Sequence, residues 1–229
     1  MDRSERRSVK GIVFDLDGTL VDSLDSIWRA TEYVLKNNGY RGVNRQDVVE
    51  AMGKTIFDLF LRAEPGLSPE EQQKLFEDYR RVYMDFIAHT RLIPKVKETL
   101  VVLRSRNLKM AVVTMKSRQN AEKILSFFGI RDFFDLVVGF EDVKEHKPSM
   151  EPIVKAAEGL GLRASELVVV GDTHIDVMAG REAGALTVAV KTGVTPLERI
   201  TSERPDFLIE DVSSLPETLE RNGLISAGD

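Results

Sequence analysis

The chain lacks cysteine altogether and contains one tryptophan and three histidines among its 229 residues. Without cysteine it can form neither a disulfide nor a thiolate nucleophile, and so few histidines argue against a transition-metal centre. No apolar run approaches the ~20 residues that a membrane-spanning helix requires. Residues 2–7 are polar and charged and lack the apolar segment of a secretory signal. We therefore expect a cytoplasmic protein without membrane contact, whose residues 2–7 form a frayed tail.

The composition is that of an ordinary globular protein, with 42% apolar and 30% charged residues. Its length is sufficient for one catalytic domain with a smaller insertion. The formal net charge of −5 argues against nonspecific binding to nucleic acid or to an anionic membrane surface. We expect a monomer or a small homo-oligomer that has no nucleic-acid partner.

Two acidic residues, Asp15 and Asp17, follow directly after an apolar run at residues 12–14 that is typical of a buried strand. Alternation along the chain places both carboxylates on the same side. Like charges at this range repel, and burying them unpaired is costly. Because two hard oxygens suit magnesium, we expect a cation there. By itself the pair could also cap a helix or occupy a solvated turn.

Three later segments repeat this layout of an apolar run followed by a polar residue. They are residues 108–113 followed by Thr114, residues 135–139 followed by a loop with Lys147, and residues 167–170 followed by Asp172 and then Asp176. In open α/β sheets, ligands bind at the edge formed by the carboxyl ends of the strands. The repeated layout therefore predicts one site at that edge.

Together these segments resemble the four signature motifs of the haloacid dehalogenase superfamily of phosphohydrolases. The matching residues are Asp15, Asp17 and Thr19 for Asp-x-Asp-x-Thr, Thr114 for the strand-end Thr or Ser, Lys147 for the Lys before Pro, and Gly171, Asp172 and Asp176 for Gly-Asp-x-x-x-Asp. The resemblance runs from about Lys10 to about Ile209. Within the superfamily it is closest to the phosphoglycolate phosphatase, pyrophosphatase and β-phosphoglucomutase branch.

The resemblance implies a magnesium-dependent mechanism through an aspartyl phosphate. Asp15 would attack phosphorus, and Asp17 would protonate the leaving oxygen and then deprotonate the attacking water. Thr114 and Lys147 would hold the transferring phosphoryl group. The implied magnesium ligands are Asp15, the backbone carbonyl of Asp17, Asp172 and, through metal-bound water or Lys147, Asp176.

Residues 22–90, between the first two motifs, show only helical periodicity. From about residue 94 onward, apolar runs alternate with helical segments, which is typical of a parallel sheet. A helical insertion at this place is similar to the cap of the family. We therefore expect a doubly wound, Rossmann-like α/β core formed by residues 1–21 and 91–229, with an all-helical cap domain at residues 22–90.

Substrate specificity has to come from the cap and the rim, because the core motifs recognise only phosphate. Lys54, which follows Gly53 between two expected cap helices, and Lys116 are candidates for binding a carboxylate or a second phosphate. The alternative for Lys54 is a solvated lysine in a routine turn. Met115 stands where close relatives usually have Asn, which makes the surface facing the substrate more apolar. Further candidate substrate contacts are Gly18 and Thr19.

We expect a phosphatase acting on a small phosphorylated metabolite, with phosphoglycolate as the lead substrate and pyrophosphate as the near alternative. A sugar phosphomutase would use the same chemistry but would need a cap arginine for the distal phosphate. Arg41, Arg45 and Arg62 lie in the cap region without a diagnostic pattern. A catalytically silent phospho-ligand binder is a third hypothesis, which the complete acidic set argues against. His146, next to Lys147, is expected at the rim of the site.

Overall fold

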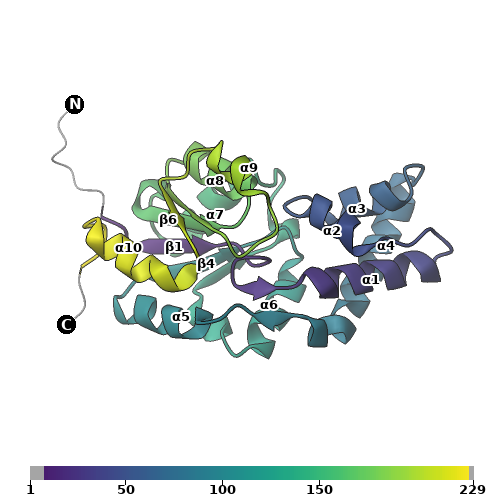
Figure 1. Cartoon of the computed structure of the whole chain (residues 1–229), viewed down its shortest axis with the longest axis horizontal. Helices are drawn as coiled ribbons and strands as arrows, with labels where there is room; N and C mark the ends of the chain where they lie inside the picture. Colours follow the sequence, from purple (N-terminus) through teal and green to yellow (C-terminus); the bar gives the residue numbers. More distant parts are fainter. Residues whose placement is uncertain (1–7, 227–229) are drawn as a thin grey trace.

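The computed structural model describes residues 8–226, so the frayed tail expected at residues 2–7 lies outside the described part. Its centre is a six-stranded sheet in which every pairing is parallel (Figure 1). In spatial order the strands are β5 (Leu136–Val138), β4 (Lys109–Val113), β1 (Gly11–Phe14), β6 (Leu167–Gly171), β7 (Leu186–Val190) and β8 (Phe207–Ile209). β1 therefore lies between β4 and β6, and the three carry most of the predicted motifs at their ends.

Helices cover both faces of the sheet, which confirms the predicted doubly wound α/β fold. One face carries α7 (Glu151–Leu160) and α8 (His174–Glu182), and the other carries α5 (Val96–Ser105), α6 (Arg118–Phe127) and α10 (Leu215–Arg221). Alternation along β1 supplies both layers, because Val13 joins the cluster with α7 while Ile12 and Phe14 join the opposite one. The sheet is therefore buried on both faces.

Shorter elements complete the core. They are α9 (Leu197–Thr201) beside α8, and the 3₁₀ helices η2 (Arg131–Phe133), η3 (Phe140–Asp142), η4 (Ala164–Glu166) and η5 (Val212–Ser214). Within the described residues, every helix is too short or too polar to cross a bilayer.

The insertion after β1 is helical, as the periodicity predicts. It contains α1 (Leu24–Asn37), α2 (Arg45–Ala51), α3 (Ile56–Ala63), α4 (Pro69–Val82) and the 3₁₀ helix η1 (Tyr83–His89). Three of these helices begin with a capping box, in which a side chain at the N-cap and one at N3 each bond the other's backbone N–H. The N-cap residues are Asn44, Thr55 and Ser68. We call this group of helices the cap.

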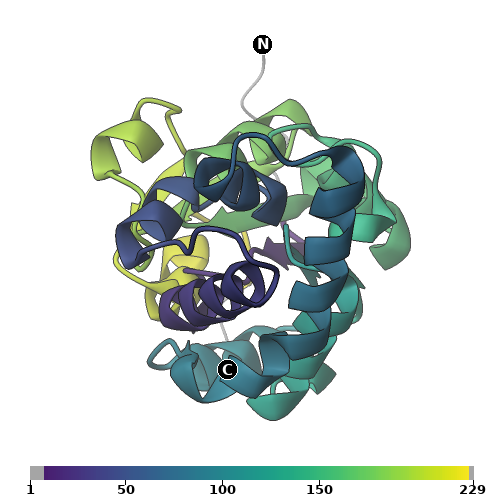
Figure 2. The same ribbon diagram turned by 90° about the vertical axis from the view of Figure 1, so that its right-hand side faces the viewer.

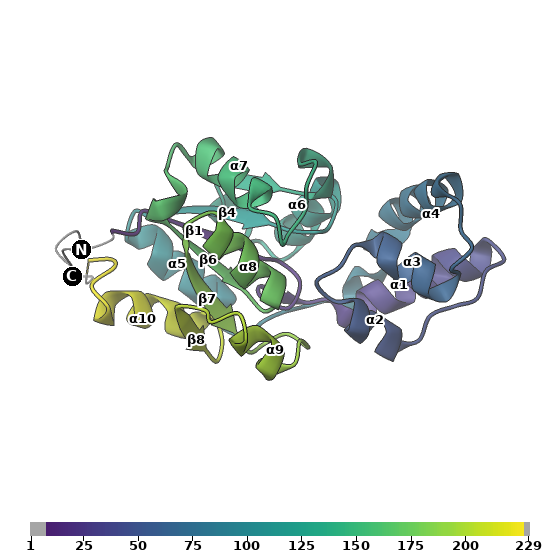
Figure 3. The same ribbon diagram turned by 90° about the horizontal axis from the view of Figure 1, so that it is seen from above.

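The cap lies beyond the carboxyl ends of the strands, set apart from the sheet (Figure 3), and Figure 2 looks onto it. The chain enters and leaves it through an antiparallel pair, β2 (Val21–Asp22) and β3 (Arg91–Leu92). The division into a core at residues 1–21 and 91–229 and a cap domain at residues 22–90 stays a prediction. The β2–β3 pair supports it, since both crossings occur at those residues.

Candidate active site

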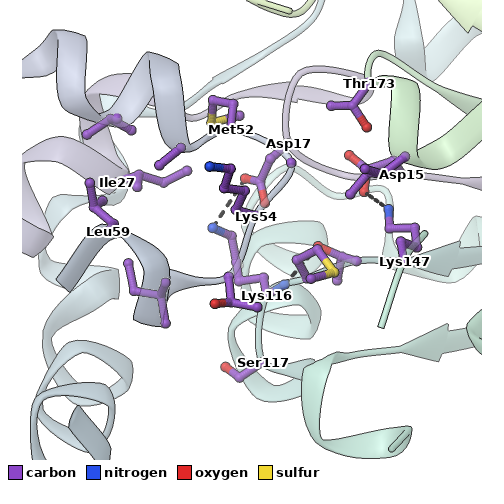
Figure 4. Close-up of a pocket in the computed structure, with 18 of the residues that line it drawn as sticks. Asp15, Asp17, Ile27, Met52, Lys54, Leu59, Lys116, Ser117, Lys147 and Thr173 are labelled. Carbon is purple, nitrogen blue, oxygen red and sulfur yellow. Dashed lines mark hydrogen bonds and ion pairs between the residues drawn. The ribbon is translucent and has the colours of Figure 1, made fainter. Parts of the chain in front are cut away.

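A cavity of about 760 Å³, part of it open to solvent, lies between the strand ends and the cap (Figure 4). Asp15 and Asp17 reach it from the end of β1, Thr114 and Lys116 from the end of β4, and Lys147 from the loop before α7. The structure thus brings together all four residues predicted to be catalytic, along with Lys116. Parallel pairing of β1 with β4 explains the meeting, since their carboxyl ends lie at one edge.

Three buried carboxylates gather beneath the cavity. Asp15, Asp172 and Asp176 place oxygens within 4.8 Å of one another. The Nζ of Lys147 lies 2.6 Å from an oxygen of Asp15 and 2.6 Å from an oxygen of Asp176, and it also donates to the Val113 carbonyl at 3.2 Å. The second oxygen of Asp176 accepts from the backbone and hydroxyl of the residue that caps α8. Asp176 therefore has both oxygens engaged, one by Lys147 and the other by the residue that begins α8.

The charges of this cluster call for a further cation. Burial raises the pKa of Asp15 to about 7, and the charges of Asp176 and Asp17 add to this effect although Lys147 opposes it. The pKa of Asp172 is raised well above its usual value, by burial and then by Asp15 and Asp176. Three carboxylates thus face one ammonium group, so a divalent cation such as Mg²⁺ would balance the charge.

The environment of Asp172 fits a metal ligand. It is 0% exposed, and its Oδ1 accepts from the Thr19 hydroxyl at 2.9 Å, whereas its Oδ2 has no hydrogen-bond partner among the described residues. Glycines flank that bare oxygen: a Cβ at Gly18 would lie 2.4 Å from it, and one at Gly193 only 1.8 Å. The Thr192 hydroxyl ties the two loops by donating to the Gly18 carbonyl at 2.6 Å. The cradle leaves one oxygen of Asp172 ready for a cation.

Asp17 is held by two side chains. Its Oδ1 lies 3.2 Å from the Nζ of Lys116 and accepts a hydrogen bond from the Ser23 hydroxyl. The Lys116 side chain is only 5% exposed, and its Nζ lies 4.4 Å from the ring centroid of Tyr83. Burial lowers the pKa of Lys116, but the charge of Asp17 and the neighbouring tyrosines raise it above its usual value. Lys116 therefore lines the cavity as the partner of Asp17, and not as an unpaired cation.

The Thr114 hydroxyl is oriented by its neighbours. Its oxygen accepts from the backbone N–H of Lys116 at 3.1 Å, and its own backbone N–H donates to the Val138 carbonyl at 3.0 Å. The hydroxyl proton thus remains available to a ligand in the cavity.

The cap contributes an apolar wall with few charges. Lys54 and Arg80 are its two cations among the described lining residues, and Lys54 is exposed. Gly53 lies close to the core, since a Cβ there would be 3.3 Å from Thr173. The apolar part of the wall consists of Ile27, Val48, Ala51, Met52, Ile56, Leu59 and Phe76. Met115 adds a further apolar side chain from the core.

The three arginines considered for a mutase lie away from the cavity, although another cap arginine, Arg80, lines it. Arg45 pairs with Asp25 at 2.7 Å, and Arg62 pairs with Asp47 at 2.9 Å and also with Glu50. The described residues that line the cavity include neither of them, nor Arg41.

Residues around Asp172 and Asp17 include two that the motifs predict and three that they do not. Gly18 and Thr19, predicted to contact substrate, lie against Asp172, and their contact with substrate stays a prediction. Ser23, Thr192 and Gly193 did not follow from the motifs. Thr192 and Gly193 could have been found, because they follow another apolar run in the same strand-then-polar layout.

The fold and the site define a doubly wound α/β enzyme that would bind an anionic ligand together with a divalent cation. The model of the haloacid dehalogenase-like hydrolases matches residues 12–190. The chain belongs to this family, as the motif resemblance predicts.

The curated relatives cover nearly the whole chain. The phosphoglycolate phosphatase of Neisseria meningitidis is 34% identical over 221 residues, which is 93% of this chain and 93% of the relative. The pyrophosphatase PpaX of Halalkalibacterium halodurans is 31% identical over 219 residues, 94% of this chain and 98% of the relative. A solved haloacid dehalogenase-like family hydrolase from Streptococcus pneumoniae has a TM-score of 0.80 at 25% identity, covering 93% of this chain and 100% of its own.

Proposed function

We propose that this protein is a Mg²⁺-dependent phosphatase that hydrolyses a small phosphorylated metabolite by way of a phosphoryl group on Asp15. The observation that carries this proposal is the meeting of Asp15, Asp17 and Lys147 at one cavity, next to the bare oxygen of Asp172. Nucleophile, acid–base group and charge stabiliser are then all within reach of one phosphoryl group.

In the first step, the phosphoryl group is held by Lys147 and by the hydroxyl proton of Thr114. A carboxylate oxygen of Asp15 forms a bond to phosphorus while the bond to the leaving oxygen breaks. Asp17 donates its proton to that oxygen, so the leaving group departs as an alcohol or acid. Lys116 and Ser23 fix the position of the Asp17 carboxyl during the transfer.

In the second step, Asp17 takes a proton from a water molecule, whose oxygen attacks phosphorus and releases the Asp15 carboxylate with inorganic phosphate. Asp15, Asp172 and the backbone carbonyl of Asp17 would hold Mg²⁺, and Asp176 would act through Lys147. When bound, this ion supplies positive charge that neutralises the phosphoryl oxygens and lets Asp15 ionise.

Phosphoglycolate is the lead substrate. Lys54 is the exposed cation of the cap wall and suits one carboxylate, and the apolar wall suits a short carbon chain. The name of the Neisseria meningitidis relative supports this choice. Pyrophosphate is the second candidate, which the name of the Halalkalibacterium halodurans relative supports. Its second phosphate would bind Lys54 together with Arg80, the other cation of the cap wall.

The test is phosphate release from phosphoglycolate, pyrophosphate, sugar phosphates and nucleotides, first with Mg²⁺ and then with a chelator. We expect Mg²⁺-dependent release, highest for phosphoglycolate. Asp15→Asn should abolish this release. The control is Asp132→Asn, which alters an exposed acid outside the site and should leave the release unchanged. Conversion of glucose 1-phosphate into glucose 6-phosphate without free phosphate would establish the mutase instead. Ligand binding without turnover of any compound would contradict the proposal in favour of a silent binder.

A further inference from the structure

One aromatic ring of the core joins the cap to the loop that carries Lys147. Phe140, the first residue of η3, lies half-buried at the boundary between core and cap. Its ring centroid is 5.7 Å from that of Phe57 in α3 and 5.8 Å from that of Phe76 in α4. It also stacks on His146, with ring centroids 4.0 Å apart and ring planes at 23° to each other. We call Phe57, Phe76, Phe140 and His146 the aromatic bridge.

The backbone of Phe140 is fixed to the rest of the site. Its N–H donates to the Lys116 carbonyl at 2.9 Å. The preceding Gly139 lies against the start of α6, because a Cβ there would be 2.2 Å from the Arg118 nitrogen. The following Glu141 accepts from that same Arg118 N–H at 3.0 Å. These contacts hold the backbone of η3 in place. A displacement of the Phe140 ring therefore changes its stack with His146.

The bridge reaches the reacting groups through one peptide bond. His146 directly precedes Lys147, whose Nζ binds Asp15 and Asp176. A stacked imidazole has its plane fixed by the partner ring, which restricts the backbone from which Lys147 extends. On the cap side, Phe76 lines the substrate cavity, and Arg80 of the same helix lies 3.8 Å from Glu141. The cap therefore contacts the core beside the cavity.

We propose that Phe140 is a positioning residue, which transmits contact with the cap through His146 to the orientation of Lys147. This inference rests on the proposed function, since it requires Lys147 to hold the phosphoryl group. When the cap lies over a bound substrate, Phe57 and Phe76 close against Phe140, and the stack on His146 aligns Lys147 with Asp15. When the cap opens, the ring loses its cap partners and this alignment relaxes.

The kinetic test compares Phe140→Leu with the wild type, with p-nitrophenyl phosphate and phosphoglycolate as probes. Because a small misplacement of a reacting group can cost up to about a hundredfold, we expect kcat to fall by about ten- to a hundredfold while KM changes by less than about threefold. Phe140→Tyr keeps the ring and should restore kcat. The control is Phe127→Leu, since this ring is 57% exposed and contacts Phe128. An unchanged kcat in Phe140→Leu would overturn the inference.

A double-mutant cycle tests the coupling to the cap. Phe57 contacts Phe140 and is absent from the described residues that line the cavity, although it also packs against the wall residue Phe76 with ring centroids 5.1 Å apart. If both rings act through one contact, Phe57→Leu lowers kcat like Phe140→Leu, and the double variant loses little more than either. Independent, multiplying losses would show that Phe140 acts without the cap.

A readout without turnover separates this inference from the proposed function. The chain has three histidines, so the ring protons of His146 can be assigned by NMR with a His146→Asn variant. We expect Phe57→Leu, which removes a ring contact of Phe140, to shift these signals. Unchanged signals would overturn the inference even in an active enzyme. A wild type that releases phosphate from no compound would instead contradict the proposed function.

Discussion

At the scale of single residues, Asp172 shows how the site is prepared for a cation. One of its oxygens is fixed by Thr19 and the other has no partner among the described residues. Gly18 and Gly193 leave room around that oxygen, where any side chain would collide with it. An unpaired buried carboxylate oxygen is costly, so its retention argues for a bound ion.

Gly193→Ala should therefore weaken magnesium binding. The added Cβ would lie 1.8 Å from Oδ2 of Asp172 and would displace the carboxylate. We expect the Kd for Mg²⁺, measured by calorimetry, to rise by about 10- to 100-fold, as for other residues that orient a metal ligand. Gly66→Ala is the matched control, because a Cβ there meets nothing within 4 Å. An unchanged Kd in Gly193→Ala would show that the cradle does not orient Asp172 for a metal.

Lys116→Met should impair proton transfer by Asp17. The substitution keeps the length of the side chain but removes the charge that lies 3.2 Å from the carboxylate. We expect a loss of about 10²-fold in kcat for alkyl phosphates, in the range of general acid–base catalysis. The loss should be smaller for p-nitrophenyl phosphate, whose leaving group needs less protonation. An equal loss for both substrates would point to phosphate binding instead, and Lys123→Met, an exposed lysine, is the control.

The motif residues of the site could be predicted from the sequence, whereas their partners could not. Asp15, Thr114 and Lys147 each stand in a recognisable local pattern. The Thr192 hydroxyl bonds the Gly18 carbonyl across 174 residues of chain, and no local pattern encodes such a contact. The same holds for Lys116, which is identifiable as a cation near the site but whose pairing with Asp17 appears only in the fold.

At the scale of elements, apolar runs located the strands that carry the site. The runs at residues 108–113 and 167–170 became β4 and β6 with boundaries shifted by one residue. The positions of β4 and β6 on either side of β1 depend on the crossover connections and their handedness, which the apolar runs do not specify. β2 and β3 are two residues each and leave too little periodicity to be recognised.

α4 begins with a Ser-x-x-Glu pattern, which is typical of a helix start and forms a capping box in the structure. Ser68 accepts from the Glu71 N–H at 3.2 Å, and Glu71 accepts from the Ser68 N–H at 2.8 Å. Ser68→Ala should destabilise the protein by about 1 kcal/mol, which lowers Tm by about 2–4 °C in a chain of this size. Its kcat should equal that of the wild type. Calorimetry measures the shift, and Ser202→Ala, at the end of α9, is the comparison.

At the scale of the whole molecule, the buried acids link stability to pH. Asp15 has a pKa of about 7 in the folded protein and 3.8 as its ordinary value. Between these values the folded state holds a proton that the unfolded state has lost, so stability falls as pH rises. In the presence of a chelator, Tm should therefore be lower at pH 8 than at pH 5.5. Asp15→Asn should reduce this slope, and a Tm that rises with pH would contradict the assignment.

Magnesium should remove the loss of stability at high pH, since it binds the ionised carboxylates. At a hundredfold excess over Kd, a ligand that binds only the folded state stabilises it by about 2.7 kcal/mol, which corresponds to about 5–10 °C in Tm for a chain of this size. The increase should be largest at pH 8. A Tm that does not respond to Mg²⁺ would contradict the metal site.

In the proposed mechanism Asp15 carries the phosphoryl group, and acid quenching of the enzyme during turnover tests this role most directly. Enzyme mixed with phosphoglycolate and Mg²⁺ is quenched, digested and analysed by mass spectrometry. We predict a phosphorylated peptide that contains Asp15, absent after incubation with chelator and absent in Asp15→Asn. Rapid phosphate release without any phosphorylated peptide, or undiminished turnover by Asp15→Asn, would contradict the covalent mechanism.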